Sequence, residues 1–124
     1  MTRHAIVLIA LIIGTWLLFD GLRAVLTGSY TTPTSGIHAG QLGPWSHLLL
    51  AIGADPFSWP IKIAHLLLGL SWLSSGIAFW LLPAKAWWPL LLTCVASLWY
   101  APFGTLAGVA VGLMLLLPAN RLAT

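Results

Sequence analysis

The chain has 124 residues, of which 60% are hydrophobic and only 6% are charged. Because a soluble domain carries about 25% charged residues, this composition excludes an ordinary soluble protein and predicts an integral membrane protein. Nucleic-acid binding requires clustered Lys and Arg, so we expect no nucleic-acid partner. Cys94 is the single cysteine, which excludes an intrachain disulfide. The net charge of the chain is +3. Its basic residues are scattered singly along the sequence: Arg3, Arg23, Lys62, Lys85 and Arg121.

The first apolar run covers residues 5–27. A helix of this length extends about 34 Å, enough to cross a hydrocarbon core of about 30 Å, so this run is the first predicted span. A secretory signal peptide is the alternative, since Arg3 precedes the run. However, Asp20 and Arg23 stand where a small-residue cleavage site would be expected.

Residues 28–60 are predicted to form an excursion outside the membrane. The segment 28–43 is rich in Gly, Ser, Thr and Pro, and its backbone needs water or protein to satisfy its hydrogen bonds. Residues 44–54 are predicted to form a short helix, because Pro44 suits a first turn and Gly53 lies near the end. This segment is too short to span, so we expect an interfacial or re-entrant helix.

Three further spans are predicted over residues 61–82, 85–101 and 103–118. Pro83 is expected to close the first of them. Pro102 divides the apolar stretch that follows. As a single helix that stretch would extend about 50 Å, so two spans fit it better. The predicted fold is therefore an all-α integral membrane protein, a compact four-helix transmembrane bundle forming one domain over residues 1–124. The alternative is that one C-terminal run is re-entrant.

Four spans place both termini on the same side of the membrane. That side would carry Arg3, Lys85 and Arg121 and no acidic residue. By the positive-inside rule we expect both termini in the cytoplasm, as in a multi-pass protein of a bacterial inner membrane. A three-span arrangement would instead export Arg121.

Most of the eight tryptophans fall near the ends of predicted spans, which is typical of an aromatic belt at the membrane interfaces. Stacking on a bound ligand is the alternative interpretation. We expect an inner belt at Trp80, Trp87 and Trp88. The outer belt is predicted at Trp45, Trp59, Trp99 and Tyr100.

Gly104, Gly108 and Gly112 recur every four residues in the fourth predicted span. Small residues let helix backbones approach closely, and such stripes are where helices in lipid gain packing energy. The stripe predicts either packing within the chain or a docking face for another copy or another membrane subunit.

His65 shares one helix face with Gly69, Trp72 and Gly76, within about 60° at the helical period, so this histidine is expected above a shallow glycine groove. An axial imidazole above small residues could seat a haem b, so His47 and His65 are candidate cofactor-binding residues, with His38 as another second ligand. One alternative is a histidine that hydrogen-bonds the outer loop. Another is a copper or zinc site formed by the three histidines.

Asp20 and Arg23 lie one turn apart near the outer end of the first span, and Lys62 begins the second. An isolated charge near hydrocarbon is costly, so we expect Asp20 and Arg23 to pair with each other or with Lys62 and Asp55. The alternative is a role in binding a proton, a quinone headgroup or a small polar solute.

The chain has no nucleophile with a base, no paired carboxylates, no phosphate loop and no zinc-protease helix, so we do not expect an enzyme. We expect a non-catalytic accessory or assembly subunit of a larger membrane complex, for example a respiratory or photosynthetic one. A haem- or metal-binding redox protein and a small homo-oligomeric transporter are the alternatives.

In size and span number the chain resembles the small multidrug resistance family. That family has a membrane-buried glutamate and short loops, whereas this chain has only Asp20 and a long loop.

Overall fold

A computed structural model describes residues 2–32, 37 and 41–118 of the chain. Over this part of the chain the structure is entirely helical and contains no strand, which confirms the all-α prediction. The helices in chain order are α1 (Thr2–Thr27), α2 (Pro44–Ala51), α3 (Trp59–Leu81), α4 (Pro83–Ala96) and α5 (Phe103–Leu115).

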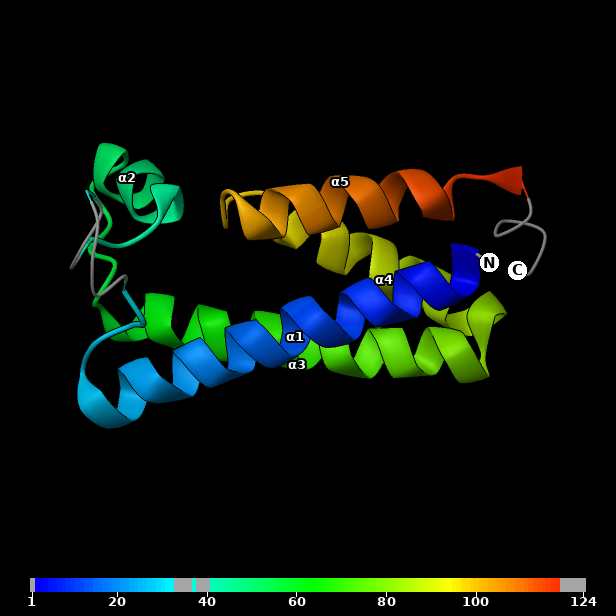
Figure 1. Cartoon of the computed structure of the whole chain (residues 1–124), viewed down its shortest axis with the longest axis horizontal. Coiled ribbons are helices and arrows are strands. Elements are labelled where there is room, and N and C mark those ends of the chain that lie inside the picture. The colour runs from blue at the N-terminus through cyan, green and yellow to red at the C-terminus, as the bar shows by residue number, and fades with distance from the viewer. Residues whose placement is uncertain (1, 33–36, 38–40, 119–124) are drawn as a thin grey trace.

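The four longer helices run alternately in opposite directions (Figure 1). The beginning of α1, the α3–α4 connection and the end of α5 lie at one end of the molecule. The short helix α2 lies at the other end, near the beginning of α5. Helix α1 packs most extensively on α3, and α4 packs against both α3 and α5.

Several helix ends differ from those predicted. Pro83 follows the end of α3 as expected, because the residue before a proline is disfavoured in the helical conformation and Leu82 is not helical. Pro83 also begins α4, earlier than the predicted start at residue 85, because a proline has no amide hydrogen to lose in a first turn. Helix α4 ends at Ala96 rather than at residue 101, and α5 ends at Leu115 rather than at residue 118. The short helix α2 ends at Ala51, before the predicted limit at residue 54.

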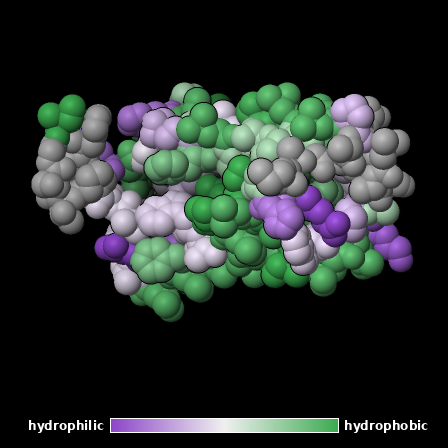
Figure 2. Space-filling model, turned by 45° about the vertical axis from the view of Figure 1, so that its right-hand side comes forward, coloured by the Kyte–Doolittle hydropathy of each residue, from purple (hydrophilic) through white to green (hydrophobic). Residues whose placement is uncertain are grey.

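The helices form a long pair and a short pair. Two helices, α1 and α3, are long and apolar enough to cross a membrane by length and composition. Helices α4 and α5 have 14 and 13 residues. At 1.5 Å per residue they extend about 20 Å, which is less than the hydrocarbon thickness of about 30 Å. Figure 2 shows that hydrophobic side chains cover much of the middle of one face.

Glycines allow α1 and α3 to approach closely. A Cβ atom at Gly69 would lie 2.6 Å from the backbone nitrogen of Leu18, and one at Gly76 would lie 2.7 Å from the Cβ of Ala10. Small residues at such contacts let helix backbones come together. The glycine face of α3 that the sequence predicts as a shallow groove is therefore covered by α1.

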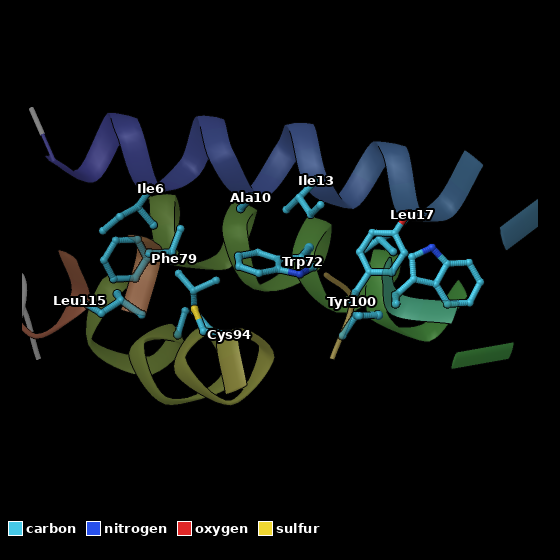
Figure 3. Packing of buried hydrophobic residues seen from close by; sticks show 14 of the residues in the cluster. Ile6, Ala10, Ile13, Leu17, Trp72, Phe79, Cys94, Tyr100 and Leu115 are labelled. Atoms are coloured by element: carbon cyan, nitrogen blue, oxygen red, sulfur yellow. The ribbon is translucent and has the colours of Figure 1, made fainter. Parts of the chain in front are cut away.

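The core lies where α1, α3, α4 and α5 meet. In Figure 3, Ile6, Ala10, Ile13 and Leu17 follow one side of α1 and face the core residues of the other helices. Trp72 of α3 is fully buried, and its Nε1 donates a hydrogen bond to Ser97 Oγ at 2.7 Å. The Ser97 hydroxyl in turn donates to the carbonyl oxygen of Thr93 at 2.8 Å. This chain of hydrogen bonds joins α3 to the end of α4 within the apolar interior.

The glycine stripe of α5 lies against α4. A Cβ atom at Gly104 would lie 2.5 Å from the Ser97 carbonyl oxygen, and one at Gly108 would lie 2.6 Å from the Cys94 carbonyl oxygen. At Gly112 the nearest neighbouring atom is the Cys94 Cβ, at 4.0 Å. Gly104 and Gly108 therefore permit a close contact within the chain.

We predict opposite effects for two single-methyl additions to this stripe. Gly108→Ala is expected to lower the free energy of unfolding by about 1–3 kcal/mol, because the new methyl meets α4 backbone. Gly112→Ala adds only an ordinary contact, and alanine favours the helix over glycine by about 1 kcal/mol, so this control should unfold no more easily than the unmodified chain. Unfolding in mild detergent measures both. Equal stabilities would contradict the packing described for Gly108.

Candidate functional site

The excursion between α1 and α3 is tied to the helical bundle through α2, and a hydrogen bond joins its own two ends. The amide of Trp45, in the first turn of α2, donates to the carbonyl oxygen of Ala101 in the α4–α5 connection at 3.1 Å. The Tyr30 hydroxyl donates to the carbonyl oxygen of Pro56 at 2.8 Å. Burial raises the pKa of Tyr30, and the Asp20 carboxylate raises it further, so this tyrosine remains a neutral donor.

His65 lies inside a cluster of aromatic side chains. Its ring centroid lies 4.6 Å from that of Trp45, 4.7 Å from that of Tyr30, 5.3 Å from that of Tyr100 and 5.5 Å from that of Trp99. We call these five residues the His65 cluster. They come from α3, from the beginning of the excursion, from α2 and from the α4–α5 connection, so the cluster joins these parts of the chain at one end of the bundle.

The two ring nitrogens of His65 have different surroundings. Nδ1 lies 2.9 Å from the Ile61 carbonyl oxygen. A carbonyl only accepts, so Nδ1 carries the proton and Nε2 is left as an acceptor. The side chain is fully buried, and Nε2 finds no hydrogen-bond partner among the described residues.

The cluster changes the interpretation of the tryptophans. Trp45 and Tyr100, predicted at the outer membrane interface, are only 4% and 2% exposed. Their rings fill the space around His65 instead of facing outward. Trp87, predicted in the inner belt, is also buried, and its Nε1 donates to the Leu115 carbonyl oxygen at 2.8 Å. Three belt residues remain exposed: Trp59, Trp80 and Trp88.

The two candidate haem ligands lie in different surroundings. His47 is exposed on α2, whereas His65 is enclosed by the four other rings of the cluster. A haem iron could reach His65 Nε2 only if these rings moved apart, and α1 occupies the groove expected to hold the porphyrin. His38 lies outside the described residues. Among those that are described, no three His, Cys, Asp or Glu side chains are grouped to hold a metal ion.

We predict that His65→Phe leaves the protein as stable as before, within about 1 kcal/mol, or makes it more stable. Phenylalanine keeps a ring within the cluster and removes the buried acceptor, and the Ile61 carbonyl keeps its helical amide donor. Thermal unfolding of the protein purified from its host, recorded with its visible absorption, tests this. A haem absorption band that disappears in His65→Phe would instead establish His65 as a haem ligand.

A cavity lies between α1, α2 and the α4–α5 connection, with a volume of about 550 Å³. We call it the polar cavity, because Asp20, Thr31 and His47 are among the residues that line it. Two residues that line this cavity are hydrogen-bonded to each other: Trp16 Nε1 donates to the Tyr100 hydroxyl at 2.8 Å. The described residues that line it include Trp16, Asp20, Trp45, His47, Tyr100 and Phe103.

Asp20 does not form the expected ion pair. Its Oδ1 accepts a hydrogen bond from the Thr31 amide at 2.7 Å, while Arg23 donates to the Thr31 hydroxyl at 3.4 Å. Lys62 lies over the Trp59 ring, 5.3 Å from its centroid. Within the described part of the chain, no acidic and basic side chains approach within 4.0 Å. Asp20 is therefore a carboxyl group that is 2% exposed and has no cationic partner there.

A second hollow, which we call the lateral groove, runs between α1 and α5. Its volume is about 460 Å³, and the residues that line it are almost entirely apolar. Two of them, Trp16 and Phe103, also line the polar cavity, so the cavity and the groove adjoin. The groove is lined by Ile9, Ile12, Ile13, Trp16, Phe103 and Ala107.

Comparison of the chain with protein-family models, curated proteins and solved structures finds no significant match. The site is therefore interpreted from its own residues. The sequence singles out Asp20 and His47, which both line the polar cavity, but not Trp16 or Phe103. Trp16 stands four residues before Asp20, on the same helix face, and this spacing is the signal that could have found it.

Proposed function

We propose that the chain is a four-span integral membrane protein with both termini in the cytoplasm, and that it is a non-catalytic accessory subunit of a larger membrane complex. Large apolar side chains point outward from all four longer helices, which supports a lipid environment, because a helix that is apolar all round suits a membrane. Arg3 and Lys85 begin α1 and α4 at the same end, which supports that end as the cytoplasmic one. Examples of the outward side chains are Leu8, Ile12, Leu67, Ile77, Leu92, Val95, Val109 and Leu113.

The observation that carries the accessory role is the shortness of α4 and α5 beside α1 and α3. A short apolar helix in a thicker bilayer thins the lipid locally or associates with another protein. Leu92 of α4 and Leu113 of α5 are 64% and 62% exposed, so this short pair offers an apolar surface. A membrane subunit that covered this surface would replace the poorly matched lipid around the short pair.

Native mass spectrometry of the tagged protein, extracted from its own host in mild detergent, tests the proposal. We expect a foreign subunit in fixed stoichiometry with the chain. A homo-oligomer without other subunits would overturn the accessory role and favour the transporter alternative. A mass increment of a haem or a metal would favour the redox alternative.

A matched pair of variants locates the partner surface. Val109 on α5 and Ile77 on α3 are 48% and 49% exposed. Val109→Trp is expected to remove the foreign subunit from the spectrum while the chain itself is still recovered. Ile77→Trp, on a helix of full spanning length, should retain it. Loss of the subunit in both variants, or in neither, would contradict the assignment to the short pair.

A further inference from the structure

We propose that the polar cavity and the lateral groove form one binding site for a long-chain amine. In this arrangement the ammonium head lies beside Asp20 and the hydrocarbon chain lies between α1 and α5. The inference goes beyond the accessory role, because it concerns a ligand of the isolated chain rather than a partner subunit.

Asp20 supplies the charge that such a ligand would neutralise. A buried charge without a partner is costly, and the cost falls when an opposite charge with hydrogen-bond donors lies beside it. The Thr31 amide supplies one hydrogen bond to Oδ1, but no cation of the described residues lies within ion-pair distance. An ammonium group in the cavity would supply both the missing charge and further donors.

The aromatic side chains of the cavity favour the same kind of head group. Trp16, Trp45 and Tyr100 line the cavity together with Asp20. Aromatic rings attract cations through their negative faces, and such rings are a common device for recognising organic ammonium groups. The described lining residues include no Lys or Arg, so an anionic head such as a phosphate or a carboxylate has no matching charge there.

The lateral groove is suited to the long hydrocarbon tail of the ligand. Its lining is aliphatic and aromatic, and it adjoins the cavity at Trp16 and Phe103. A single molecule can therefore place a polar head in the cavity and an apolar chain in the groove. An amine without a chain would leave the groove unfilled, so we expect it to bind more weakly than its long-chain counterpart.

The experiment uses the full chain, purified in a mild non-ionic detergent and free of other subunits. Dodecylamine, dodecanoate and ethylamine are added in turn, and thermal unfolding and native mass spectra are recorded. We expect dodecylamine to raise the unfolding temperature saturably with one molecule bound per chain. Dodecanoate and ethylamine should do so at least tenfold more weakly. Equal effects of dodecanoate and dodecylamine would overturn the proposal.

Variants test separately how the ammonium head and the hydrocarbon tail of dodecylamine contribute to binding. Asp20→Asn keeps an acceptor for the Thr31 amide and removes the charge, so we expect at least tenfold weaker dodecylamine binding with little change in the unfolding temperature without ligand. Unchanged binding would overturn the role of Asp20. Ala107→Leu fills the groove and should also weaken binding, whereas Ala110→Leu, at an exposed position of α5, should not. Equal binding by these two variants would overturn the role of the groove.

These results are independent of the accessory role. Dodecylamine binding is measured on the isolated chain, and partner association is measured on the complex from the host. Either proposal can therefore fail while the other holds.

Discussion

Gly69→Ala is expected to destabilise the protein by about 3 kcal/mol, the upper end of the usual cost of overpacking. The added Cβ would lie 2.6 Å from the Leu18 backbone nitrogen and 3.0 Å from the Gly14 carbonyl oxygen. Both contacts are with helix backbone, which cannot turn aside as a side chain can. The substitution must push α1 away from α3 along their shared surface.

The free energy of unfolding of Gly69→Ala, measured by SDS titration in mixed micelles, tests this prediction. Gly112→Ala is the control, because a Cβ there meets nothing nearer than 4.0 Å. If Gly69→Ala were as stable as Gly112→Ala, the close approach of α1 and α3 would be wrong.

Trp72→Ala is expected to lower the free energy of unfolding by about 3–5 kcal/mol, as for other large aromatic side chains removed from a packed core. Trp72 is fully buried, and its indole also donates the hydrogen bond to Ser97. Trp72→Phe keeps most of the ring and removes this hydrogen bond, so it should cost less. We expect about 1 kcal/mol from the lost bond, in addition to any loss of packing.

The same SDS titration measures these variants, with Trp88→Ala as the control. Trp88 is 64% exposed, so its removal should change stability by no more than about 0.5 kcal/mol. A loss for Trp88→Ala as large as that for Trp72→Ala would contradict the position of Trp72 at the centre of the bundle.

The sequence predicts the long helices well because no proline interrupts their largely apolar runs. The predicted limits 5–27 and 61–82 differ from those of α1 and α3 by three residues or fewer. The end of α4 at Ala96 was missed because no glycine or proline marks it. There the Ser97 side chain is held by Trp72 and Thr93, in a contact that forms only when α3 and α4 pack together.

The site was less predictable than the helices, for a related reason. Helical spacing correctly places His65, Gly69 and Gly76 on one face, but spacing cannot say what covers a face. Helix α1 covers the two glycines, and rings from distant segments cover the histidine. Likewise, Trp16 meets Tyr100 across 84 residues of sequence, which no local pattern could reveal.

The hydrogen bond from the Trp45 amide to the Ala101 carbonyl has a consequence for the order in which the protein is made. Synthesis proceeds from the N-terminus, so Trp45 leaves the ribosome more than fifty residues before Ala101. Helix α2 therefore lacks this acceptor while α3 and α4 are synthesised. The end of the molecule that holds the polar cavity therefore cannot be completed before residue 101 is made, and a chain shortened before that residue would lack this hydrogen bond.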